Sequence, residues 1–197
     1  MTFQTDSNGL TALESFTFSD CTRLGDVTLP GTLHIIGGGA FDRCGSLAKL
    51  LIPGSVDDIL PYAFNFCTNL TEVFFGGNAP FIASSIFNGV PSVSLYYLPG
   101  TVGWADFSAN TGLAIATWLL SNPTILNFEP DFGVQTNAFG FTISWATNPP
   151  VVVEASSDLA NSIWTPVSTN ILVDGISYFS DPQWTNYPGR YYRLRSP

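Results

Sequence analysis

Apolar positions in the first half of the chain recur with a period of 23 residues. Aligned at this spacing, the segments share several columns. One column is all phenylalanine: Phe18, Phe41, Phe64 and Phe87. The others are Leu13, Ile36, Ile59 and Ile82; Leu24, Leu47, Leu70 and Val93; Val27, Leu50, Val73 and Tyr96; and Leu29, Ile52, Phe75 and Leu98. Agreement at so many columns indicates an internal repeat of one structural unit.

Each repeat predicts one turn of a stacked, β-rich coil. Segments such as LAKLLIP alternate between apolar and polar residues, which is typical of a short strand with Leu50 and Ile52 facing inward. Pro and Gly then turn the chain, and a second extended piece leads into the AF..C segment, which curls back. Because no single repeat can bury its apolar face, neighbouring repeats must stack into a continuous core.

Residues 36–56, IGGGAFDRCGSLAKLLIPGSV, resemble the repeat of BspA-like bacterial leucine-rich repeat proteins, and the resemblance runs from residue 10 to about residue 104. The repeat at 79–102 departs from it, since Val90 and Pro91 stand where the cysteine is expected. VSLYYLPGTVGWADF resembles the closing segment of such arrays, so we expect Trp104 and Trp118 to cover the last repeat. The resemblance implies a surface protein that binds host or matrix proteins or other cells.

From about residue 121 the period becomes two. FGFTISWAT places Phe141, Ile143 and Trp145 on one side of a strand, and short segments follow between Pro, Gly and Asn clusters. This pattern predicts a small antiparallel β-sandwich. The segment beginning VVVEASSDLANSIWTPVSTN resembles a fibronectin type III-like module at the ends of surface or secreted proteins of Verrucomicrobia-like bacteria. Arg193 and Arg195 share one face, either as a solvated edge that discourages strand addition or as a patch for an anionic partner.

The predicted fold is therefore mainly β, with two domains. Residues 1–120 form a leucine-rich-repeat solenoid whose closing segment is 105–120, residues 121–127 form a linker, and residues 128–197 form the sandwich. Cys21, Cys44 and Cys67 share one repeat position, where we expect buried thiols that pack as small apolar groups. A disulfide between two of the cysteines would leave the third unpaired, and a metal site would need a fourth ligand. Both alternatives are therefore less favoured than buried free thiols.

Composition and sequence motifs argue against several classes of function. Fifteen acidic against six basic residues give a net charge of −9, without the basic stripe that nucleic-acid binding requires. No apolar run is long enough to insert into a membrane. No phosphate loop, dinucleotide fingerprint or zinc motif is present, so we expect no cofactor. The N-terminal segment MTFQTDSNGL shows no signal peptide, and we expect the natural start, with an export signal, to lie upstream.

The outward positions of the long strands offer a candidate binding surface. Leu51, Phe74 and Tyr97 share one column of the 23-residue alignment, and Lys49 and Glu72 lie beside it. Exposed aromatic residues with polar neighbours suit a protein partner or a sugar ring. The alternative is that the second domain or the linker covers this column.

Two groups of side chains are candidates for a catalytic site, but the evidence for them is weaker than that for the binding surface. Thr11, His34 and Asp57 share a column and resemble a hydroxyl, a base and an orienting carboxylate, although a surface contact between His34 and Asp57 is the simpler interpretation. Asp26 and Glu72 lie two repeats apart, roughly 10 Å, near the upper limit for an inverting glycosidase. Lys49 lies between these two carboxylates and would neutralise them.

The interpretation that the sequence favours is a non-enzymatic binding or adhesion module outside the cell or on its surface. It would recognise a protein or polysaccharide ligand through the exposed face of the solenoid. The alternative is a carbohydrate-active protein: either a glycan-binding accessory domain or a weak hydrolase, more plausibly a glycosidase than an esterase, that uses surface carboxylates.

Overall fold

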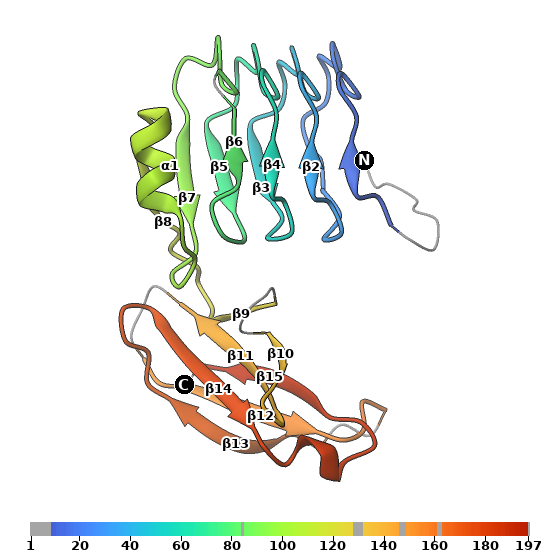
Figure 1. The fold of residues 1–197 in the computed structure, drawn as a ribbon, viewed down its shortest axis with the longest axis vertical. Helices are drawn as coiled ribbons and strands as arrows, with labels where there is room; N and C mark the ends of the chain where they lie inside the picture. The colour runs from blue at the N-terminus through green and yellow to red at the C-terminus, as the bar shows by residue number, and fades with distance from the viewer. Residues whose placement is uncertain (1–8, 84, 128–131, 146–148, 161–162, 197) are drawn as a thin grey trace. The chain divides into compact units, whose positions relative to one another are not determined.

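The computed structural model describes residues 9–83, 85–127, 132–145, 149–160 and 163–196. The chain divides into two compact units, each rich in β-strands (Figure 1). Unit 1 comprises Met1–Tyr97 and Thr101–Ala116, and unit 2 comprises Leu98–Gly100 and Thr117–Pro197.

Unit 1 is a coil whose successive turns contribute strands to two sheets. One sheet has the order β1 (Ala12–Leu13), β2 (Ile35–Ile36), β4 (Asp58–Ile59) and β6 (Phe81–Ile82). The other has the order β3 (Lys49–Ile52), β5 (Glu72–Phe75), β7 (Ser94–Tyr97) and β8 (Ile115–Thr117). Parallel pairing brings Leu13, Ile36, Ile59 and Ile82 into register, so the 23-residue period is the length of one turn.

The phenylalanine column is the spine of unit 1, as predicted. Neighbouring rings of Phe18, Phe41, Phe64 and Phe87 stack nearly parallel, with centroids 5.3, 5.6 and 5.5 Å apart. Leu50 and Ile52 are also buried, as the alternation predicted. Each turn therefore contributes one ring and one strand face to a core that continues along the coil.

The three cysteines differ in burial, although the sequence predicted that all would face the core. Cys44 and Cys67 are buried, and their thiols donate to the carbonyl oxygens of Phe18 (3.2 Å) and Phe41 (3.0 Å) one turn back. Cys21 is exposed. Among the described residues, no turn lies before that of Cys21 to cover its thiol and accept its hydrogen bond. The prediction is therefore confirmed for two thiols and wrong for the first.

We expect Cys21 alone to react with an aromatic disulfide reagent while the protein is folded. Burial raises the pKa of the Cys44 thiol to about 11 and that of Cys67 to about 12, and the thiolate is the reactive form. A spectrophotometric titration should count one fast thiol in buffer and three in denaturant. The variant Cys21→Ser should lose the fast phase, and three fast thiols in buffer would contradict the prediction.

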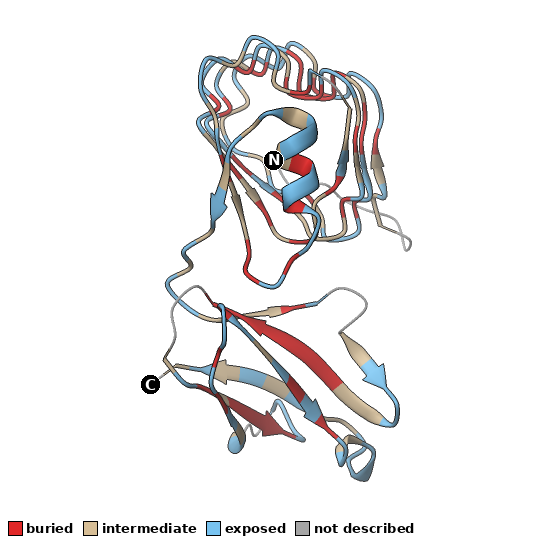
Figure 2. Ribbon diagram, turned by 60° about the vertical axis from the view of Figure 1, so that its left-hand side comes forward, coloured by how far each residue is buried: buried red, intermediate tan, exposed pale blue. Residues whose placement is uncertain are grey.

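A helix closes the C-terminal end of the coil. In Figure 2, α1 (Trp104–Thr111) lies across the end of unit 1, with its buried residues turned inward. The ring of Trp104 stacks on Tyr97 at 5.4 Å, and the ring of Phe107 meets Phe75 edge-on at 5.7 Å. Trp104 thus covers the last turn as predicted, together with Phe107, and Trp118 belongs to unit 2.

Unit 2 contains two antiparallel sheets. In one, β11 (Ala138–Ser144) pairs with β9 (Thr124–Leu126), β10 (Gly133–Gln135) and β14 (Ile176–Asp181). In the other, β12 (Val151–Ser156) lies between β13 (Thr165–Asn170) and β15 (Tyr191–Arg195), which follows the short helix η1 (Trp184–Asn186). One buried cluster draws on both sheets, with Phe141 and Ile143 from β11 and Val151 and Val153 from β12. Strand β9 lies within the range predicted as a linker.

The basic residues of β15 have a partner that the sequence analysis did not foresee. Arg193 Nε and Arg195 Nε donate to the two carboxylate oxygens of Glu154 at 2.8 and 2.9 Å. These hydrogen bonds, together with the positive charges, hold the pKa of Glu154 below its usual value. Glu154 thus offsets one of the two positive charges of this face, and both arginine side chains remain about half exposed.

Candidate functional site

The outward face of β3, β5 and β7 carries an apolar stripe. Parallel pairing aligns Leu51, Phe74 and Tyr96, and the rings of Phe74 and Tyr96 stack at 5.0 Å with 15° between their planes. The Leu51 side chain is 51% exposed, and both rings are half-buried. This set, called the strand-face stripe below, is a continuous apolar surface on one side of the sheet.

Tyr97, which the sequence placed in this stripe, faces the interior instead. Phe75 pairs with Tyr97, and Tyr97 packs against the core beside Trp104. The reason is that the last turn is one residue shorter: Lys49 pairs with Glu72 across 23 positions, but Glu72 pairs with Ser94 across 22. Since side chains alternate along a strand, a shift of one residue exchanges the two faces.

An ion pair flanks the strand-face stripe. Lys49 Nζ lies 2.5 Å from Glu72 Oε2, and the hydrogen bond to Glu72 raises the pKa of the Lys49 ammonium group. The two residues are directly paired on β3 and β5. Asp26, the other carboxylate considered for hydrolysis, is exposed and lies one turn before Lys49 and two turns before Glu72. Lys49 therefore forms an ion pair with Glu72 on this face of the sheet.

His34 and Asp57 form the surface contact that the sequence favoured. His34 Nδ1 lies 2.8 Å from Asp57 Oδ2, and both side chains are more than half exposed. Thr11 contributes its backbone carbonyl, which accepts from the amide of His34 at 2.7 Å. The described residues hold no group of three His, Cys, Asp or Glu side chains that could bind a metal ion.

A ladder of hydrogen bonds between side chains, which the sequence analysis missed, runs along the turns of the coil. Asn65 Nδ2 donates to Asp42 Oδ1 at 2.6 Å, and Asn88 Nδ2 donates to Asn65 Oδ1 at 2.8 Å. The three residues are spaced 23 apart, so the same alignment that identified the apolar columns contains this signal. The ladder satisfies Asp42, which is largely buried, and ends at Asn88.

The same turns expose aromatic side chains in a left-handed backbone. Phe16 and Tyr62 occupy equivalent positions two repeats apart, each with φ 62°, and both rings are more than half exposed. Gly39 lies between them in the column, and a Cβ atom there would come within 2.5 Å of the Phe16 ring. Phe16 and Tyr62 thus provide a second exposed aromatic pair on unit 1, away from β3, β5 and β7.

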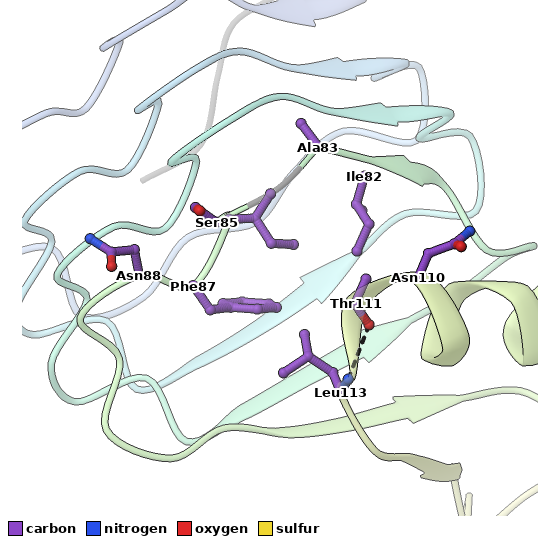
Figure 3. Close-up of a pocket in the computed structure, with 9 residues that line it drawn as sticks. Ile82, Ala83, Ser85, Phe87, Asn88, Asn110, Thr111 and Leu113 are labelled. Carbon is purple, nitrogen blue, oxygen red and sulfur yellow. Dashed lines mark hydrogen bonds between the residues drawn. The ribbon is translucent and has the colours of Figure 1, made fainter.

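A cavity of about 380 Å³ opens where the last turn meets the closing helix (Figure 3). The last turn contributes residues 82–88, apart from 84, and the helix and the residues after it contribute Asn110, Thr111 and Leu113. Phe87, the last ring of the stack, points into this region in Figure 3. The sequence analysis did not predict the cavity, because it depends on how the helix sits over the last turn.

These features define unit 1 as a leucine-rich-repeat solenoid with a helical cap. The family model for the BspA type leucine rich repeat region matches residues 2–109 in 6 copies. Since this match covers more than half of the chain, the protein belongs to that family, as the resemblance of residues 36–56 indicated. No curated protein and no solved structure matches the chain. Among the described residues, no helix is long and apolar enough to cross a bilayer.

Proposed function

We propose that this protein is a binding module that recognises a protein partner through the strand-face stripe. The observation that carries the proposal is the alignment of Leu51, Phe74 and Tyr96 on the outer side of one sheet. Aromatic residues are enriched among the residues that dominate binding energy at protein interfaces, where they are surrounded by a polar rim. Lys49 and Glu72 supply such a rim, and their mutual pairing leaves little net charge at the stripe.

A protein is favoured over a polysaccharide at this site because the stripe joins an exposed aliphatic side chain to two half-buried rings. The rings of Phe74 and Tyr96 stack at 5.0 Å and so form one apolar patch rather than two separate platforms. Leu51 adds aliphatic surface that suits a protein side chain better than a hydroxylated ring. BspA-type proteins are often surface adhesion proteins, which is consistent with this assignment in general terms.

The setting that we propose is outside the cell or on its surface. Unit 2, with two antiparallel sheets around one apolar cluster, would be an accessory sandwich of the fibronectin type III-like kind. Hydrolysis is the less favoured alternative. It would depend on Asp26 and Glu72, of which Glu72 is paired with Lys49, or on His34 and Asp57, which form a contact with both side chains more than half exposed to solvent.

The double variant Phe74→Ala/Tyr96→Ala should lose at least tenfold in affinity for the partner, because hot-spot truncations cost about 2 kcal/mol or more. The measurement is binding to an array of extracellular-matrix and cell-surface proteins, followed by surface plasmon resonance on the proteins that bind. A circular dichroism melt of each variant verifies that it is folded.

The matched control is Phe16→Ala/Tyr62→Ala, which removes the same two residue types from the turns of the coil. This control should bind like the wild type. Equal binding by Phe74→Ala/Tyr96→Ala and the wild type, or loss only in the control, would show that the stripe is not the recognition site.

A further inference from the structure

The cavity beside Phe87 exists because the stack of rings stops there. Phe18, Phe41 and Phe64 are each followed by another ring 5.3 to 5.6 Å away. The residue 23 positions after Phe87 is Asn110, which lies in α1 and offers no ring. Within the described part of the chain, Phe64 is the only ring that stacks on Phe87.

The closing helix fills only one side of the last turn. Trp104 and Phe107 cover the strand side, where they pack on Phe75 and Tyr97. On the side of Phe87, the space is bounded by Ile82 and Leu113 and stays open to the extent of about 380 Å³ (Figure 3). Ligand sites in proteins occupy about 300 to 1,000 Å³, and benzene fits a cavity of about 150 Å³. The cavity can thus hold one ring together with its substituents.

The walls combine an apolar floor with neutral polar groups. The floor consists of the Phe87 ring and of aliphatic side chains, and the rim carries Ser85, Asn88, Asn110 and Thr111. None of the described lining residues is charged. Asn88 donates its amide to Asn65, and its Oδ1 has no partner among the described residues, so an acceptor remains at the rim. Asn110 offers a second amide, which is exposed.

We propose that this cavity binds a single neutral pyranose ring, with the apolar face of the sugar on Phe87 and its hydroxyl groups on Asn88 and Asn110. The absence of charged lining residues disfavours an anion, a cation or a zwitterion, since each would be desolvated without a counter-charge. A plain aromatic ring would fill the same space but would leave the two rim amides without partners, which costs free energy where they are covered. The site is separate from the strand-face stripe, so it does not depend on the proposed protein partner.

The test is protein-observed NMR on the full chain. Glucose, galactose, mannose and N-acetylglucosamine are each titrated to 100 mM, with p-cresol as the aromatic probe. We expect at least one sugar to shift the amide resonances of Ser85, Asn88, Asn110 and Leu113, while the resonances of β3 and β5 remain unchanged. No shift at the cavity with any of these sugars, or shifts there with p-cresol alone, would overturn the proposal.

Two variants locate the binding on the rim. Asn88→Ala/Asn110→Ala should weaken sugar binding at least tenfold, because it removes both amides while leaving the core of unit 1 intact. Asn69→Ala, which alters an exposed amide elsewhere on the same coil, should bind like the wild type. Unchanged affinity in the double variant would contradict the assignment of the rim, and loss of binding in Phe74→Ala/Tyr96→Ala would place the sugar on the stripe instead.

Discussion

Replacing Phe64 by alanine is expected to lower the free energy of unfolding of unit 1 by about 4 kcal/mol, within the range for aromatic residues truncated in a core. The Phe64 ring has no exposed surface, and rings stack on both of its faces at 5.6 and 5.5 Å. Truncation therefore removes apolar burial and leaves a cavity that the flanking turns cannot close without losing their strand register. Urea denaturation followed by circular dichroism measures the change.

Phe81→Ala is the control for this prediction. Phe81 lies in β6 of the same unit, but its side chain is 69% exposed, so its truncation should change stability by no more than about 0.5 kcal/mol. Phe64→Leu, which keeps most of the buried volume, should fall between the two and guards against a variant that fails to fold. Equal effects of Phe64→Ala and Phe81→Ala would disprove the stacked core.

Replacing Asp181 by alanine should destabilise unit 2 by about 3 kcal/mol, the lower end of the range for removing one partner of a buried ion pair. Asp181 Oδ2 accepts from Arg190 Nε at 2.6 Å and from the Tyr192 hydroxyl at 2.9 Å, and Asp181 Oδ1 accepts from the amide of Gln183 at 2.9 Å. The Asp181 and Arg190 side chains are only 8% and 12% exposed. The variant leaves a largely buried guanidinium without its counter-ion, and the denaturation midpoint of unit 2 should fall.

The matched control is Asp57→Ala, which removes a carboxylate paired with His34 at 2.8 Å but 71% exposed. Exposed pairs contribute about 0 to 1 kcal/mol, so this variant should be nearly neutral. If both variants have the same small effect, burial of the Asp181 cluster does not matter for stability.

Acid provides an independent check on the Asp181 cluster. Burial alone would raise the pKa of Asp181, but the amide of Gln183, the hydroxyl of Tyr192 and the charge of Arg190 lower it below its usual 3.8. A carboxylate with a lowered pKa in the folded state stabilises the protein above its unfolded pKa, and this contribution disappears as the pH falls through the folded value. The difference in stability between wild type and Asp181→Ala should therefore shrink below about pH 4.

Repetition explains why so much of unit 1 could be predicted. A parallel coil places each residue beside the one 23 positions away, so columns such as Phe18, Phe41, Phe64 and Phe87 are contacts as well as an alignment. The same spacing of 23 residues indicates the contact of His34 with Asp57 and the pairing of Lys49 with Glu72. Contacts between equivalent positions of neighbouring turns are therefore visible in the sequence.

The 23-residue alignment misplaces residues where the repeat changes length. Between Val90 and Ser94 the last turn loses one residue, so Tyr96 rather than Tyr97 joins the strand-face stripe. A fixed 23-residue alignment cannot show where a deletion takes effect, because both tyrosines are aromatic and either could face outward. The prediction of burial is wrong for Cys21 for a related reason. Burial of a thiol requires a preceding turn, and the described residues include none before that of Cys21.

By itself, the sequence determined the period of unit 1, its aromatic spine and the family to which the chain belongs, because each of these follows from residues that repeat at constant spacing. Only the tertiary structure decided the face of Tyr97, the partners of Glu154 and Asp181, and the cavity at Phe87. Those features arise where segments without a common period meet: a shortened turn, strands of unit 2 far apart in the chain, and a helix over the last ring. There, side-chain placement follows from packing geometry that spacing along the chain does not encode.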